Sequence, residues 1–103
     1  MTVRTYANVS VQCNDQGYLE NLNEWTKEVG NAIAEEEGIT MTDKHWEVVD
    51  FIQDQYRNEV SLTIRKVGKS GVVSIKEFYQ LFPDGPLKKS SRISGIPKPV
   101  SCI

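Results

Sequence analysis

The sequence is poor in the residues from which most catalytic and metal sites are built. Its 103 residues include one histidine and two cysteines. It contains no CxxC or HExxH motif and no cluster of Cys and His, so we expect no metal site and no cofactor. The two cysteines, Cys13 and Cys102, lie near opposite ends of the chain. In a reducing compartment we expect free thiols there rather than a structural disulfide.

Long hydrophobic runs are also absent. Residues 1–10 lack the apolar core of a signal peptide, and no stretch is long enough to span a membrane. We therefore expect a cytoplasmic protein without a membrane partner. The chain is too short for two hydrophobic cores, so it is expected to form one domain.

Charge is divided unevenly along the chain, although the net charge is only −2. Residues 1–83 carry eight Lys/Arg against thirteen Asp/Glu, a net charge of −5. Residues 84–103 carry Lys88, Lys89, Arg92 and Lys98 against Asp84, a net charge of +3. An acidic body with a basic tail favours a tail that docks on its own body or on an acidic partner.

Hydrophobic periodicity predicts an N-terminal β region followed by helices. Residues 3–11 alternate loosely and predict one or two short strands, with a turn at residues 14–17 before a further extended stretch. Helical periodicity then predicts about four helices: residues 23–37 capped by Asn23, a helix capped by Thr42, a short helix starting near Ser61, and a helix capped by Ser74 and ended by Pro83.

Two polar features within these helices have both a structural and a functional interpretation. We interpret the acidic run at residues 35–37 as a solvated surface rather than a metal site. We interpret His45, in the first turn of its helix, as a packing or capping residue rather than a catalyst.

The last two helices have helix–turn–helix spacing with several cations, Arg65, Lys66, Lys69 and Lys76, which is a weak signal for DNA binding.

From Asp84 onward, prolines, glycines and serines are expected to prevent any regular element, while isoleucines and valines are interspersed among them. The sequence thus predicts an α+β fold, with a short β hairpin or meander packed on a mainly helical array. It divides into a body of residues 1–83 and a flexible, extended C-terminal arm of residues 84–103.

The penultimate residue, Cys102, is the main candidate for chemistry. A cysteine next to a chain terminus is not expected to fill a core, and an extended arm could carry it into a cleft of another protein. Neighbouring cations, Lys98 and Arg92, would favour the nucleophilic thiolate. The residues alone leave two alternatives equally open: a sulfur-accepting nucleophile, or an incidental terminal cysteine.

The C-terminal run resembles the signature of the DsrC/TusE family of sulfur-relay proteins. The matching stretches are FPDGP at residues 82–86 and SGIPKPVSCI at residues 94–103, with further similarity at residues 15–19, 23–25, 37–39 and 44–49. The resemblance implies a small α+β fold with a mobile arm. It also implies a carrier, rather than a self-sufficient enzyme, that bears sulfur as a persulfide on Cys102.

Two departures separate this chain from the family pattern. Two-cysteine members have a second arm cysteine eleven positions before the first, where this chain has Ser91, and the segment between Ile64 and Ser74 is short. Cys13 matches no family cysteine and is expected to be a small apolar filler. The leading hypothesis is therefore a TusE-like carrier. It would work with a TusBCD/DsrEFH-like complex and a thiouridylase, toward 2-thiouridine in tRNA.

Two alternatives remain beside it. The first is a gamma-type accessory protein of a dissimilatory sulfite reductase-like complex. The second is a sulfur-sensing helix–turn–helix regulator, for which direct nucleic-acid binding is less favoured because the body is acidic.

Overall fold

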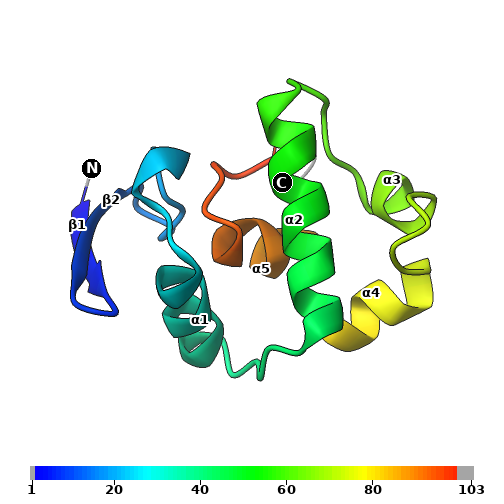
Figure 1. Ribbon diagram of the computed structural model, residues 1–103, viewed down its shortest axis with the longest axis horizontal. Helices are drawn as coiled ribbons and strands as arrows, with labels where there is room; N and C mark the ends of the chain where they lie inside the picture. Colours follow the sequence, from blue (N-terminus) through cyan, green and yellow to red (C-terminus); the bar gives the residue numbers. More distant parts are fainter. Residues whose placement is uncertain (1, 100–103) are drawn as a thin grey trace.

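The computed structural model describes residues 2–99. Its elements are β1 (Thr2–Tyr6), β2 (Val9–Cys13), the 3₁₀ turn η1 (Leu22–Glu24), α1 (Lys27–Glu36), α2 (Asp43–Arg57), α3 (Ile64–Gly68), α4 (Ile75–Leu81) and α5 (Pro86–Ile93). The β hairpin lies at one end of the molecule and the α3–α4 pair at the other, with α1, α5 and α2 between them (Figure 1). The predicted α+β class is confirmed.

The hairpin follows from a two-residue turn. Ala7 and Asn8 both have positive φ, 52° and 64°, which is the type I′ geometry that suits the twist of paired strands. The strands pair antiparallel from Thr2 opposite Cys13 to Tyr6 opposite Val9. A single bridge between Cys13 and Leu19 continues the pairing, as the sequence predicts.

The first long helix starts later than its periodicity suggests, so the expected Asn23 cap is wrong. Residues 22–24 form the separate turn η1, and Trp25 is extended between that turn and α1. Thr26 is the N-cap of α1, because its side-chain oxygen accepts a hydrogen bond from the Val29 amide at 3.1 Å. The break turns Trp25 toward α5, where its ring makes the contacts described below.

The caps of the next three helices agree with the sequence at two positions of three. Thr42 begins α2, and a reciprocal Ser74–Glu77 capping box begins α4. The third helix starts at Ile64 with Thr63 as its cap, rather than near Ser61. It has only five residues, so the α3–α4 pair is a short helical corner.

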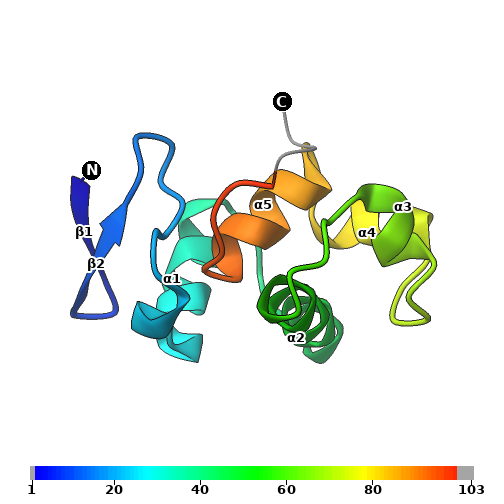
Figure 2. The same cartoon turned by 90° about the horizontal axis from the view of Figure 1, so that it is seen from above.

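The expectation that no regular element follows Asp84 is wrong, because residues 86–93 form α5. Pro86 occupies the first turn, where its fixed φ suits a helix and its missing N–H is not needed. Gly85 and Gly95 have positive φ and flank the helix instead of interrupting it. α5 packs against both α1 and α2 and lies between them in the view from above (Figure 2).

The hydrophobic core runs between the helices and continues into the predicted arm. Its fully buried side chains come from β2, from all five α-helices and from the loops between them, and among them are Val11, Ile33, Ile52, Val67, Phe78 and Ile93. Ile96 is 2% exposed, so close packing extends three residues past the end of α5. None of the helices within residues 2–99 has the length and apolar character needed to cross a membrane.

Candidate functional site

Cys102 lies outside the described residues, so its surroundings begin with the chain that leads to it. That chain is the last turn of α5 and the segment 94–99. Serines occupy the buried side of this turn, and Ser94 Oγ donates a hydrogen bond to the Ser90 carbonyl at 2.6 Å. Their small side chains let α5 lie close to its neighbouring helices.

Two side chains hold the carbonyl groups at the end of α5. Trp25 Nε1 donates to the Ile93 carbonyl at 2.7 Å, and Gln53 Nε2 donates to the Ser94 carbonyl at 2.8 Å. Carbonyls at a helix C-terminus have no partner within the helix, so these two bonds satisfy groups that would otherwise be buried unpaired. They also tie the end of α5 to the segment that leads into α1 and to α2. The chain therefore leaves the packed body from a fixed point.

Gly95 is required at this exit for two independent reasons. Its φ is +76°, a conformation that a residue with a Cβ adopts at a cost. A Cβ built at Gly95 would also lie 2.4 Å from Cδ1 of Trp25, and the neighbouring Trp25 atoms are nearly as close. The indole that binds the Ile93 carbonyl thus covers the face of the Gly95 backbone.

Gly95→Ala is expected to lower the free energy of unfolding by about 3 kcal/mol, of which about 1 kcal/mol is the backbone cost and the rest the displacement of Trp25. Gly38→Ala is the matched control, because Gly38 has the same φ of +76° and no atom within 4 Å of a built Cβ. It should lose only about 1 kcal/mol. Urea unfolding followed by circular dichroism measures both losses. Equal losses in the two variants would show that the Trp25 contact is unimportant.

Arg92, one of the two predicted helpers of the thiol, is buried inside the molecule. Its Nε donates to the Gly17 carbonyl at 3.0 Å. One terminal nitrogen donates to Glu37 at 2.7 Å, and the other donates to Glu36 and to the Tyr6 hydroxyl, both at 2.8 Å. One side chain thereby joins α5 to α1, to β1 and to the turn that follows β2.

The acidic run at residues 35–37 is therefore more than the solvated surface that the sequence suggests. Glu36 and Glu37 supply the counter-charges of Arg92, while Glu35 stays exposed. Burial raises the pKa of the Glu36 carboxyl, but the hydrogen bond from Arg92 and the charges of Arg92 and Arg4 outweigh it and hold that pKa below its ordinary value. Burial also raises the pKa of the Tyr6 phenol, which keeps it protonated beside them.

Lys98, the other predicted helper, is half-buried and borders two hollows in the surface. The larger, of about 700 Å³, is a mostly apolar groove between the end of α2, residues 59–63 and residues 96–99. The smaller, of about 280 Å³, lies beside α5. Arg92 lines the smaller hollow as well, so the structure brings both predicted helpers to the same place.

The remaining cysteine and the serine at the second family position are both enclosed. Cys13 is fully buried in the β region, as expected of an apolar filler, and burial raises the pKa of its thiol. Its reactive thiolate is therefore scarce. Ser91 is also fully buried, and its Oγ has no hydrogen-bond partner within residues 2–99.

His45 is a capping residue, as predicted. Its Nδ1 accepts a hydrogen bond from the Thr42 amide at 3.0 Å. Its Nε2 lies 2.9 Å from the Leu81 carbonyl oxygen, which only accepts, so that nitrogen carries the proton. Both ring nitrogens are engaged and the ring packs edge-on against Phe82, so His45 fixes α2 to α4 and is not available for catalysis.

Sequence reasoning overlooked Trp25 and Gln53 as anchors of α5 and Tyr6 as a partner of Arg92. One signal could have found Gln53: it is a polar residue on the otherwise apolar stripe of α2 with Val49 and Ile52. Nothing comparable marks Tyr6, which reads as an ordinary strand residue.

Comparison with known proteins gives consistent matches over nearly the whole chain. The model of the family described as DsrC like protein matches residues 5–103. Sulfurtransferase TusE of Yersinia pseudotuberculosis is 40% identical, with 90% of this chain and 94% of the relative covered. Sulfurtransferase TusE of Escherichia coli K12 is 38% identical, with 90% and 93% covered.

Solved structures agree with these matches. The crystal structure of dissimilatory sulfite reductase I (DsrI) has a TM-score of 0.87 at 31% identity, with 99% of this chain and 100% of that chain covered. The solution structure of Allochromatium vinosum DsrC has a TM-score of 0.82 at 29% identity, with 98% and 97% covered. The oxidised gamma-subunit DsrC of Archaeoglobus fulgidus has a TM-score of 0.84 at 26% identity, with 99% and 100% covered.

Proposed function

The chain belongs to the DsrC-like family, and from this we propose that it is a sulfur carrier, which takes up sulfur as a persulfide on Cys102 and passes it to a partner protein. The observation that carries the proposal is that the family match runs through residue 103 and so includes the penultimate cysteine. Relatives named sulfurtransferase support the same chemistry.

The proposed step is an exchange between a thiolate and a persulfide. The Cys102 thiolate attacks the outer sulfur of a donor persulfide, a new S–S bond forms on Cys102, and the S–S bond of the donor breaks. The donor cysteine leaves as a thiolate, so no oxidant or reductant is consumed. Delivery to the acceptor repeats the exchange in the other direction. Lys98, four residues before Cys102, would favour the attacking thiolate.

The segment after Ile96 would present the thiol to the partner. Ile96 is packed in the core, and Cys102 follows it by six positions, which allows a reach of at most about 20 Å from the body. Arg92 would then serve the arm by anchoring α5, because its charge is already balanced by Glu36 and Glu37. The part of the arm that moves would be the part beyond Ile96.

Ser91 narrows the proposed role to transfer between proteins. Without a second arm thiol, no disulfide can close within the arm, so sulfur on Cys102 must be handed on. We favour a TusE-like relay from a TusBCD/DsrEFH-like donor toward a thiouridylase and 2-thiouridine in tRNA. The likeness to DsrC structures supports a second candidate, an accessory protein of a sulfite reductase-like complex.

The proposal is tested by incubating the protein with a cysteine desulfurase and free cysteine, followed by intact mass and peptide mapping. We expect one added sulfur atom, removable by a reducing thiol and located on the C-terminal peptide that contains Cys102. The absence of an adduct, or an adduct on the peptide of Cys13, would contradict the proposal.

A further inference from the structure

The structure divides the four cations of the basic tail into two groups. Arg92 is turned inward and is neutralised by Glu36 and Glu37. Lys88, Lys89 and Lys98 make no ion pair with any residue of the described range 2–99. The sequence allows this tail to dock either on its own body or on an acidic partner. Arg92 binds the body, and the three lysines remain available to bind an acidic partner.

These lysines share one surface feature, which we call the lysine hollow. It encloses about 280 Å³ and is lined by Gln16, Tyr18, Glu37, Asp84, Lys88, Lys89, Arg92 and Lys98. Glu37 is compensated by Arg92, so Asp84 is the one carboxylate of this lining without an ion-pair partner among residues 2–99. Three lysines against Asp84 leave a surplus of two positive charges, on a protein whose net charge is −2.

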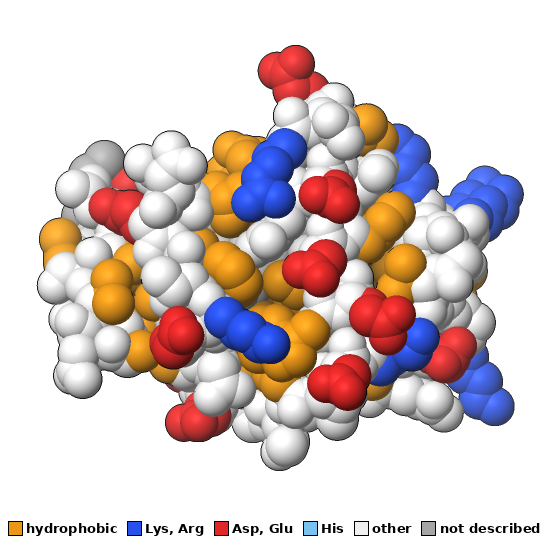
Figure 3. Space-filling model, in the orientation of Figure 1, with side chains coloured by type: hydrophobic (Ala, Val, Ile, Leu, Met, Phe, Trp, Pro, Cys, Tyr) orange, Lys and Arg blue, Asp and Glu red, His pale blue; other side chains and the backbone are white. Residues whose placement is uncertain are grey.

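The face seen in Figure 3 carries both acidic and basic side chains. Acidic side chains form a row along α2, whose exposed positions include Asp43, Glu47, Asp50 and Asp54. Residues at this spacing lie on one side of a helix. Glu47 and Asp54 are paired with Lys44 and Arg57, so Asp43 and Asp50 are the acids of this row without an ion pair among residues 2–99. These two carboxylates repel a partner with an acidic surface while the lysine hollow attracts it, so charge favours an encounter at the hollow.

We propose that the lysine hollow is a docking site for an acidic segment of the protein that exchanges sulfur with Cys102, which rests on the proposed carrier function. The volume suits one or two carboxylate side chains, and the half-buried Lys89 and Lys98 are part of its lining. Lys98 is four residues from Cys102, a contour length of at most about 13 Å. Docking here brings the acidic partner within reach of the thiol.

Nucleic acid fits this surface less well than an acidic protein segment. Affinity for a duplex comes largely from lysines and arginines that each neutralise a phosphate, about six to ten of them in a strongly salt-dependent binder. The hollow has three lysines without an ion pair among residues 2–99. The acidic row on α2 would oppose a long polyanion, but it would not oppose a short acidic segment.

Binding is tested without sulfur chemistry, by nuclear magnetic resonance titration of the Cys102→Ser protein with an acetylated hexaglutamate peptide at low salt. We expect shifts around Gln16, Tyr18, Lys88 and Lys89. The triple change Lys88→Gln, Lys89→Gln and Lys98→Gln should weaken binding roughly tenfold, since each exposed pair contributes a modest share.

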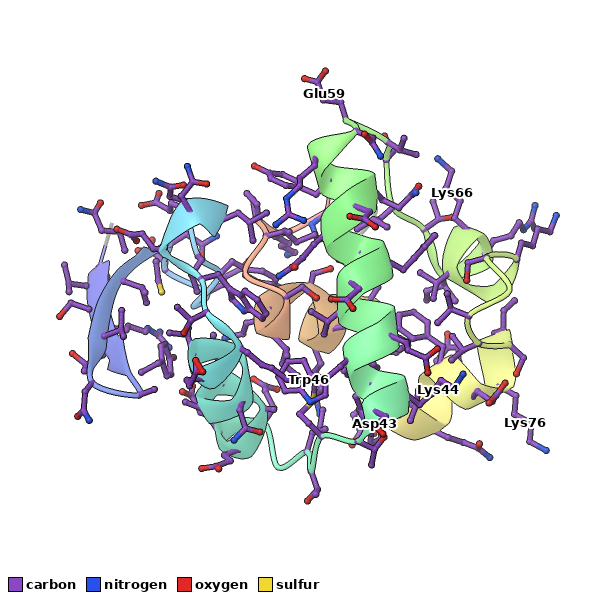
Figure 4. The ribbon with its side chains drawn as sticks, viewed as in Figure 1. Asp43, Lys44, Trp46, Glu59, Lys66 and Lys76 are labelled. Atoms are coloured by element: carbon purple, nitrogen blue, oxygen red, sulfur yellow. The ribbon has the colours of Figure 1, made fainter. Side chains whose placement is uncertain are left out.

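The matched control removes three cations from the α3–α4 end of the molecule, none of which lines the hollow: Arg65→Gln, Lys69→Gln and Lys76→Gln. These residues are exposed on and between α3 and α4, and Lys76 is labelled there in Figure 4. This control should bind the peptide as tightly as the unchanged protein, within about twofold. Equal weakening in both triple variants, or no shift at the hollow, would overturn the proposal.

Two competitor titrations complete the experiment. Sodium sulfate at matched ionic strength should displace the peptide no better than sodium chloride does, and a short RNA duplex should bind more weakly than the peptide. Stronger displacement by sulfate, or tighter binding of RNA, would overturn the acidic-segment proposal in favour of the other ligand. Sulfur uptake by Cys102 is measured separately, so either proposal can fail without the other.

Discussion

Cys102→Ser is expected to reduce sulfur uptake from a cysteine desulfurase to the background level, because a serine hydroxyl forms no persulfide. Cys13→Ala is expected to leave uptake unchanged. Cys13 is fully buried and burial raises the pKa of its thiol, so it offers little thiolate and no access for a donor protein. Intact mass spectrometry after a fixed incubation measures the fraction of each variant that carries an added sulfur atom.

Comparing sulfur uptake by the two variants shows which of the two cysteines accepts the sulfur atom. An adduct that persists in Cys102→Ser would place the accepted sulfur elsewhere and contradict the carrier proposal. Circular dichroism of Cys13→Ala is needed beside it, because this change shortens a buried side chain at the end of β2. The loss of a sulfur atom there should cost about 1 kcal/mol, which leaves the protein folded.

The elements that could be predicted from the sequence are those specified by neighbouring residues. The hairpin, the Thr42 cap and the Ser74–Glu77 box each depend on side chains within a few positions of one another. The missed helix α5 shows the limit of this reasoning. Proline and glycine predict a break in regular structure, whereas Pro86 lies in the first turn of the helix and the two glycines lie outside it, which only the folded backbone shows.

Within the candidate site, only the residues that belong to the C-terminal sequence motif could be predicted. Cys102 and Lys98 stand out in the terminal run, but the contacts that hold the base of the arm join residues far apart in sequence. The bonds from Trp25, Gln53 and Arg92 to their partners span 68, 41 and 86 positions. No local pattern specifies such pairs. From the sequence alone, an arginine among serines is expected to be exposed to solvent. Only the packing of α1 and β1 around Arg92 shows that it is buried.

Arg92→Met is expected to lower the free energy of unfolding by about 3 kcal/mol, since it removes one partner of a buried charge network and leaves the others uncompensated. The Arg92 side chain is 7% exposed, and its removal leaves the Gly17 carbonyl without this donor and the Tyr6 hydroxyl with only the longer bond from Arg4, at 3.3 Å. Methionine keeps the apolar stem, so the loss reports the charge and hydrogen bonds. Urea unfolding followed by circular dichroism gives the value.

Lys76→Met is the matched control, because Lys76 is exposed on α4 and forms no ion pair within residues 2–99, and it should change stability by less than about 0.5 kcal/mol. Adding Glu36→Gln and Glu37→Gln to Arg92→Met should recover part of the loss, because the two carboxylates that Arg92 balances are then neutral. A loss no larger than that of Lys76→Met would show that the network does not anchor α5.

The loss of stability caused by Arg92→Met is expected to depend on pH. Because the pKa of Glu36 in the folded protein lies below its ordinary value of 4.5, its ion pair with Arg92 stabilises the fold above that pH, and the contribution disappears as pH falls through the lowered pKa. Arg92→Met lacks this contribution at every pH. The difference in unfolding free energy between the unchanged protein and Arg92→Met should therefore be constant near neutral pH and narrow below pH 4.5. A difference that stays constant on acidification would mean that Arg92 stabilises α5 through its hydrogen bonds to Tyr6 and Gly17 alone.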